Sequence, residues 1–237
     1  MSGHSKWSTI KRQKGVTDAK KGQLFTKLSY AITIAAKQGG MDSSTNFKLR
    51  LAIDKARASN MPKDSIERAV QKASGGEKSE MDEHIYEGFG PGGTAIIVQT
   101  ITDNKQRTVS EVKNLFEKNG GSMGSQGSVA YLFEKLGEIT VIKSGKNVDE
   151  LLEIGLDVGA GDMDEDELRV YFYTNFADLF KVKQALEEKN IVVEGAELIY
   201  KPKITIEVSQ EVGEKVMNVV EKLEELDDVQ KVYTNLA

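Results

Sequence analysis

The sequence contains no cysteine, one tryptophan, two histidines and three prolines among its 237 residues. Because cysteine is absent, disulfides, zinc ribbons, thiol catalysis and cysteine-ligated iron–sulfur clusters are excluded. A chain of this length can bury a substantial hydrophobic core without covalent or metal cross-links. The lack of cysteine also fits a reducing compartment.

Long hydrophobic runs are missing as well. The longest strongly apolar run lies near residues 95–98, which is far too short to span a membrane. The N-terminal residues are polar and charged, so we expect no signal peptide. We therefore expect a cytoplasmic protein without membrane contact.

Recognisable catalytic groups are equally scarce. The two histidines, His4 and His84, fall in segments that look like an arm and a linker. The sequence has no nucleophile elbow, metal-binding triad or phosphate-binding loop. We therefore predict that the protein is not an enzyme and needs no cofactor or metal.

The charge is distributed unevenly along the chain, although the net charge is only -5. Residues 1–80 contain 16 lysines and arginines against 7 aspartates and glutamates, whereas the remainder contains 16 against 30. A basic first third on an acidic body favours a polyanionic partner for the first third. The acidic remainder is not expected to lie along phosphates.

Helical periodicity dominates the basic first third. Apolar residues recur at helical spacing over 17–38, 46–59 and about 62–73, which predicts three helices. Glycine pairs follow the first and third of these, as expected at helix ends. Residues 1–76 therefore form a basic arm and a helical domain, and 77–84 reads as a charged linker.

The remaining residues alternate between strand and helix patterns. The predicted strands are 94–102, 129–133, 138–142, a weak segment near 156–160, 168–174, 191–200 and 229–233, with 204–208 extended. The predicted helices are 104–119, 147–155, 176–189 and 210–226. The fold class is therefore α+β, with a ferredoxin-like domain at 137–202 inserted into a second α/β domain of the same plan, formed by 77–136 and 203–237.

Basic residues are densest at the N-terminus, around the single tryptophan. Lysine and arginine displace counterions from phosphates, and an aromatic ring can stack on an exposed base. Trp7 could equally anchor the arm on the helical domain. We predict that the nucleic-acid-binding residues are Lys6, Trp7, Lys11, Arg12, Lys14, Lys20, Lys21, Lys27, Arg50, Arg57 and Arg107.

Two glycine-rich segments have plain structural explanations. YEGFGPGG at 86–93 satisfies the glycine spacing of a dinucleotide-binding loop, but it precedes a strand instead of opening a helix. It also departs from an RNA-recognition motif, because Glu87 stands at the basic position and Pro91 at the position of a stacking phenylalanine. We interpret it as a tight turn. GGSMGSQGS at 120–128 is either a place of close backbone approach or a mobile connection.

Two polar segments leave alternatives open. In TDNKQRT at 102–108, Asp103 or Asn104 can cap the following helix, while Arg107 beside the helix N-terminus would suit a phosphate or carboxylate. The acidic run at 162–167 lacks the spacing of a calcium loop, so we interpret it as a solvated turn.

Several separate segments together resemble one family. They are GHSKW at 3–7 with IKR at 10–12, FTK at 25–27, MPK at 61–63 with Ile66, YEGFGPGG at 86–93, TDN and RT within 102–108, and DDVQKVYTN at 227–235. The sequence is similar over essentially its whole length to the YebC/PmpR family. The resemblance implies a three-domain bacterial protein of a kind described as probable DNA-binding transcriptional regulators. Related proteins, including a mitochondrial branch of translational activators of cytochrome oxidase, are linked to translation, notably through proline-rich stretches.

Two functional hypotheses follow for this sequence. One is a DNA-binding transcriptional regulator, and the other is a ribosome-associated factor that binds RNA and assists elongation. The sequence shows no compact helix-turn-helix with a convincing reading helix and no dimer symmetry suited to palindromic sites, so we expect a monomer. The acidic body would repel a long duplex but could face basic ribosomal proteins.

Overall fold

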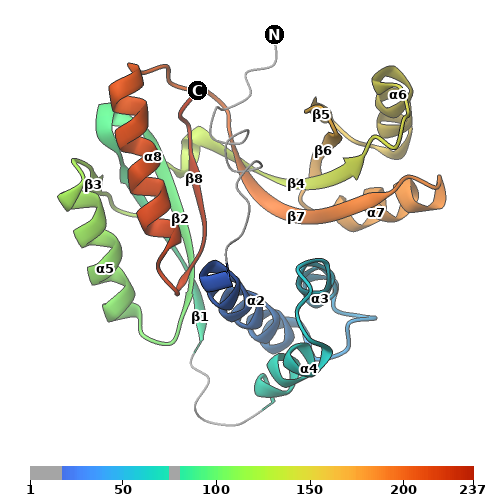
Figure 1. Ribbon diagram of the computed structural model, residues 1–237, viewed down its shortest axis with the longest axis horizontal. Coiled ribbons are helices and arrows are strands. Elements are labelled where there is room, and N and C mark those ends of the chain that lie inside the picture. The colour runs from blue at the N-terminus through green and yellow to red at the C-terminus, as the bar shows by residue number, and fades with distance from the viewer. Residues whose placement is uncertain (1–17, 75–80) are drawn as a thin grey trace. The chain divides into compact units, whose positions relative to one another are not determined.

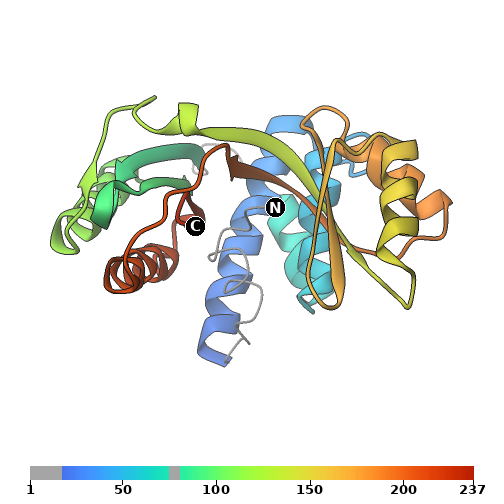
Figure 2. The same ribbon diagram turned by 90° about the horizontal axis from the view of Figure 1, so that it is seen from above.

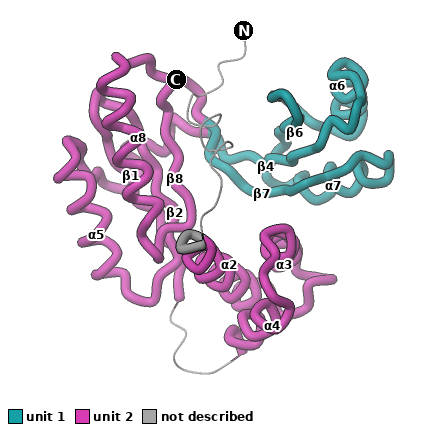
Figure 3. The backbone as a smooth tube through the Cα atoms, in the orientation of Figure 1, with its two compact units in different colours: residues 1–4, 134–201 teal, residues 5–133, 202–237 magenta. Residues whose placement is uncertain are grey.

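The structure is a computed structural model that describes residues 18–74 and 81–237. Its described residues form two compact units, which Figure 3 distinguishes by colour. Unit 1 comprises residues 134–201. Unit 2 comprises the described residues up to 133 together with 202–237.

Three helices form the first part of unit 2. They are α2 (Asp18–Gly39), α3 (Phe47–Ala58) and α4 (Lys63–Lys72), which confirms the three predicted helices. Leu28, Ile32 and Leu49 are buried in their common core. Asn46 closes the turn before α3, because its side chain caps the Leu49 amide and also donates to the Ala35 carbonyl.

A four-stranded sheet forms the second part of unit 2. Its order is β3 (Ser122–Met123), β1 (Asp82–Phe89), β2 (Ala95–Thr102) and β8 (Val229–Thr234), with antiparallel neighbours. The helices α5 (Lys105–Lys118) and α8 (Gln210–Glu224) lie side by side on one face (Figures 1 and 2). The buried side chains of Phe116 and Leu223 come from these helices, and Ile96 and Val98 come from β2.

Unit 1 follows the predicted order of elements. The order is β4 (Phe133–Ile142), α6 (Val148–Val158), β5 (Asp162–Glu165), β6 (Arg169–Asn175), α7 (Leu179–Glu188) and β7 (Val193–Pro202), the order of a ferredoxin-like domain. The strands are arranged β5-β6-β4-β7. Both helices pack on the same face, where Phe172 lies against Gly155 and Leu179 lies against Gly137.

The predicted start of the sheet in unit 2 was wrong. Strand β1 occupies Asp82–Phe89, so the end of the predicted linker and the start of the predicted turn are both strand. Only Pro91–Gly93 forms the tight turn, in which Gly92 has a φ of 72°. Three acidic residues, a histidine and a glycine among its eight positions obscure the strand, because they leave little apolar periodicity.

Three predictions in and around unit 1 were also wrong. Residues 129–133 are not a strand, since Ala130–Leu132 is a 3₁₀ turn and β4 begins only at Phe133. The weak segment near 156–160 is not a strand, because α6 continues to Val158 and ends at Gly159, whose φ is 96°. The acidic run begins as strand β5, where Lys201 bonds Asp162, and is not simply a turn.

A buried carboxylate explains why residues 129–133 do not form a strand. The Glu87 carboxylate accepts hydrogen bonds from the amides of Gly127, Val129 and Ala130, at 2.7, 2.8 and 2.8 Å. Its residue is only 4% exposed. Burial alone would raise the pKa of Glu87, but these three hydrogen bonds outweigh it and lower the pKa. The glycine-rich connection is therefore held against β1.

We expect Glu87→Gln to lower the free energy of unfolding by about 2 kcal/mol near neutral pH, because buried amides lose charged acceptors. Since the pKa is lowered on folding, the unfolded chain binds more protons in the intervening pH range. The stability contribution is therefore present above the ordinary pKa of 4.5 and is lost as the pH falls through the folded value. Urea unfolding of both proteins across this range measures the difference.

The matched control is Glu111→Gln, which removes one exposed carboxylate from α5. This variant should unfold like the parent protein at every pH. A stability difference between the parent protein and Glu87→Gln that does not shrink in acid would contradict the assigned role of Glu87.

Candidate nucleic-acid interface

The predicted binding residues fall into groups with different surroundings. Five of them lie outside the described residues, namely Lys6, Trp7, Lys11, Arg12 and Lys14. Lys20 lies in α2, but the structure describes only its backbone. The remaining five have described side chains, and unit 2 contains them all.

Two of the five project into solvent. Lys21 is exposed near the start of α2. Arg57 lies in the last turn of α3 with 71% of its side chain exposed, and its closest acidic neighbour is Asp54 at 4.0 Å. An exposed pair at that distance contributes little stability, so Arg57 can exchange Asp54 for a phosphate at small cost.

Arg50 has a structural task in the turn between α2 and α3. Its Nε donates to the Ser43 carbonyl at 2.9 Å, and its Nη2 donates to the Ser44 carbonyl at 2.7 Å. These bonds fix the backbone ahead of the α3 N-terminus. Arg50 therefore positions this turn, whatever else its guanidinium contacts.

Lys27 and its neighbour Gln23 attach α2 to the end of α8. The Lys27 Nζ donates to the Glu224 carbonyl at 2.5 Å. The Gln23 amide lies 2.5 Å from the Glu225 carbonyl and 3.2 Å from an Asp227 carboxylate oxygen. These carbonyls end a helix, where a cation is favoured by the helix dipole.

A small apolar cluster reinforces the attachment of α2. Ile34 of α2 packs with Met81 and with Ile101 of β2, and all three are buried. Tyr30 packs against the same cluster. Burial, followed by the negative charge of Asp228, raises the pKa of Tyr30. The sheet and the helices of unit 2 are thus joined by both apolar and polar contacts.

Arg107 belongs to none of the three helices and lies at the start of α5. Its Nη2 contacts the Asp103 carboxylate at 3.1 Å and both Asp228 oxygens at 3.1 and 2.9 Å. Hydrogen bonding to Asp228 is the main reason that the pKa of Arg107 is raised. The Thr102 and Thr108 hydroxyls lie 3.0 and 2.7 Å from the same buried carboxylate. Asn104 caps the helix, as the sequence allowed.

Besides Arg57, the α3 and α4 segment carries exposed cations that are not among the eleven predicted binding residues. Residues 47–72 contain seven lysines and arginines against three acidic residues. Lys63 is 86% exposed and pairs with Glu67 at 3.6 Å. Its signal in the sequence is its place directly after Pro62, at the first position of a helix. We call Lys48, Lys55, Arg57, Lys63, Arg68 and Lys72 the α3–α4 cations.

The connection between α3 and α4 has the length of a helix-turn-helix. Four residues, 59–62, separate the two helices, and Asn60 adopts a left-handed φ of 58°. The exposed residues of α4 include Asp64 and Glu67 beside Lys63 and Gln71. A reading helix with two carboxylates in its first turns is poorly suited to approach phosphates closely.

Comparison with known proteins covers nearly the whole chain. Residues 5–76 match the TACO1/YebC protein N-terminal domain, and residues 81–236 match the TACO1/YebC second and third domain. A protein of Dehalococcoides mccartyi named as a probable transcriptional regulatory protein is 48% identical over 99% of this chain and 94% of its own length. A protein of the same description from Acidithiobacillus ferrooxidans is 50% identical, with the same coverage.

A solved structure has the same fold. The crystal structure of a conserved hypothetical protein from Aquifex aeolicus superposes with a TM-score of 0.91 at 42% identity. The match covers 98% of this chain and 97% of that one. Within residues 18–74 and 81–237, no helix is both long and apolar enough to cross a membrane.

Arg107→Gln separates a structural role from phosphate binding. If Arg107 mainly neutralises Asp228, the variant should lose about 2 kcal/mol of unfolding free energy, because a buried carboxylate loses a charged partner. The dependence of nucleic-acid affinity on salt should not change. Denaturant unfolding and binding titrations at graded salt measure the two quantities. Unchanged stability with a salt slope lowered by about one unit would identify a phosphate contact instead.

Proposed function

Because the chain belongs to the TACO1/YebC family, we propose that it is a nucleic-acid-binding regulator of gene expression. Its relatives from two bacterial groups are named as probable transcriptional regulatory proteins. This name describes a regulator and not an enzyme. Transcriptional regulation through DNA is accordingly the first candidate.

The observation that carries the proposal is the segregation of charge. The α3–α4 cations lie on a segment with a clear positive excess, whereas unit 1 contains 16 acidic residues against 8 basic ones. Phosphates bind where cations accumulate and release counterions when they do so. The basic arm at 1–15 precedes this segment in the sequence and contains four lysines and arginines and no acidic residue.

Within the predicted binding set, we propose a division of labour. Lys21 and Arg57 contact phosphates together with the arm residues, since both are exposed. Lys27, Arg50 and Arg107 chiefly hold the scaffold, since each is engaged with carbonyls or carboxylates. We further propose three domains, with 137–202 inserted between 77–136 and 203–237 and with the arm and helices in 1–76.

A ribosome-associated role in translation is the second candidate, favoured by the charge of unit 1. A surface with twice as many acidic as basic residues repels a long duplex but attracts basic ribosomal proteins. The α3–α4 cations would then contact structured RNA. In either role we propose that the protein acts as a monomer in the cytoplasm.

Charge reversal of the arm tests the shared basis of both candidates. We expect Lys11→Glu, Arg12→Glu and Lys14→Glu together to weaken nucleic-acid binding and to lower the slope of log K against log salt by about three units. The free energy of unfolding should hardly change, because terminal arms contribute little to a core. Titrations at several salt concentrations give the slope.

The matched control carries the same charge change elsewhere. Lys118, Lys181 and Lys189 are exposed residues outside the first third, and their replacement by glutamate should leave the slope nearly unchanged. Equal effects of the two triple variants would mean that only the net charge matters, and the assigned surface would be wrong.

Sedimentation from lysate separates the two candidates. A transcriptional regulator should sediment as free protein and should footprint a promoter. A translation factor should comigrate with ribosomes, and that comigration should be lost at high salt and after ribonuclease treatment. Comigration that survives both treatments would contradict binding through phosphates.

A further inference from the structure

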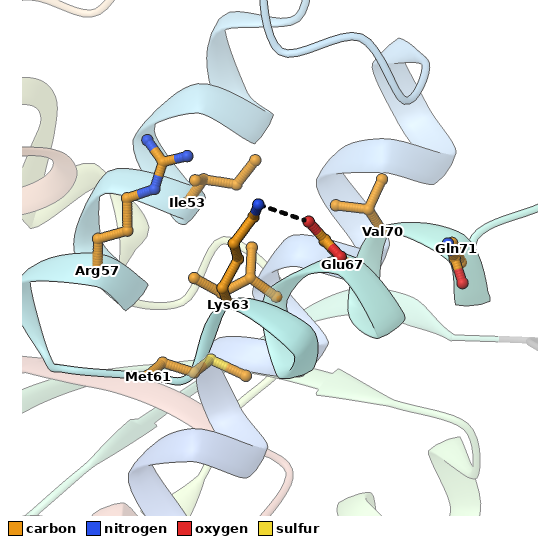
Figure 4. A pocket seen from close by; sticks show the side chains of 8 residues that line it. Ile53, Arg57, Met61, Lys63, Glu67, Val70 and Gln71 are labelled. Atoms are coloured by element: carbon orange, nitrogen blue, oxygen red, sulfur yellow. Dashed lines mark ion pairs between the residues drawn. The ribbon is translucent and has the colours of Figure 1, made fainter.

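An apolar groove opens between α3 and α4 (Figure 4). It has a volume of about 390 Å³, which lies within the range of small-ligand sites. Ile53 of α3 and Ile66 and Val70 of α4 line it, with Met61 of the connecting turn at one end. The groove is therefore built from aliphatic and thioether surface within a basic segment.

The groove exists because both helices pack on α2. The Thr33 hydroxyl of α2 bonds to the Ala69 carbonyl of α4, and Asn46, which caps α3, bonds to the Ala35 carbonyl of α2. Ile66 is 6% exposed and belongs to the helical core, whereas Ile53 and Val70 are only partly buried. The apolar side chains of Ile53 and Val70 therefore remain partly exposed beside the buried Ile66.

Polar residues at the rim give the groove its chemistry. Arg57 stands on the α3 side, and Lys63, Glu67 and Gln71 stand on the α4 side (Figure 4). Lys63 is directed toward Glu67, as the ion pair in Figure 4 shows. The rim therefore combines a planar guanidinium, an ammonium and an amide that can donate and accept hydrogen bonds.

We infer that this groove holds one unpaired base of DNA or RNA, while Arg57 and Lys63 bind the adjoining phosphates. The inference rests on the proposed function and specifies which form of nucleic acid the helices recognise. A regular duplex keeps its base faces stacked inside, so it has no base face to place on aliphatic surface. An unpaired base offers a flat apolar face with polar edges, matching Val70 and Gln71.

Size and charge favour a base over a protein segment. An amphipathic helix binds through apolar anchors spread over about two turns, whereas only four apolar residues line this groove. Arg57 can also stack its guanidinium plane on a base, as arginine does in many complexes with single strands. A site for one base beside two cations fits a strand that is locally melted or looped.

The test compares hairpins that differ only in their loop. One hairpin has an intact loop of several bases, and the other has the same loop with abasic nucleotides, which keep the phosphates. Both are made in DNA and in RNA, with a fully paired duplex as reference. We expect the full-length protein to bind the intact loop about tenfold more tightly than the abasic loop, the value of one well-seated base.

Variants assign that difference to the groove. Val70→Met fills part of the groove without changing the charge or adding an aromatic face, so it should greatly reduce the tenfold difference while leaving duplex affinity unchanged. Arg57→Lys keeps the charge but removes the planar group, so it should reduce the difference severalfold. Arg68→Lys is its matched control, because Arg68 bonds to Asp64 and Ser65 of its own helix and does not line the groove. Thermal unfolding verifies that each variant is folded.

Other outcomes overturn the inference in distinguishable ways. Equal binding of intact and abasic loops would be consistent with the proposed function but would show that the groove does not hold a base. No binding to any hairpin or duplex at low salt would contradict the proposed function as well. If Val70→Met disrupts a dimer or the binding of an acidic helical peptide, and the loop bases have no effect, the groove binds a protein and not a base.

Discussion

Helix α2 is the element on which the rest of unit 2 depends, because it packs in two directions at once. One side carries Leu28 and Ile32 into the core shared with α3 and α4. The other side places Lys27 against the end of α8 and Ile34 against β2. The helices that carry the α3–α4 cations therefore pack on a helix that is held on two sides. A binding surface on helices with so small a core of their own needs such a support.

Positively charged side chains have two different roles in this chain. Lys27 and Arg50 donate to backbone carbonyls, and Arg107 donates to the buried Asp228 carboxylate. Arg57 and Lys63 have only exposed ion pairs of small energetic value. A count of basic residues does not distinguish the residues that are bonded within the protein from those with only exposed ion pairs. Only the residues with exposed ion pairs can bind phosphate without a loss of stability. This difference supports the proposal that these exposed residues bind phosphate.

The elements that the sequence predicted well are those with local causes. The three helices of 18–72 were expected within one or two residues because apolar spacing, Asn46 and Pro62 mark them. The 3₁₀ turn at Ala130–Leu132 was missed because its cause lies in Glu87, which takes the Val129 and Ala130 amides that a strand would need. Lys27 likewise meets a carbonyl 197 residues away. The groove arises from packing on α2, which no local pattern reports.

Photochemical cross-linking of the full-length protein to a nucleic acid that it binds tests the account most directly, because it locates the contact without any substitution. The account predicts that cross-linked peptides come from the basic arm and from α3 and α4, with Arg57, Lys63 and Gln71 among the modified residues. Cross-links confined to unit 1, whose surface is rich in carboxylates, would contradict it.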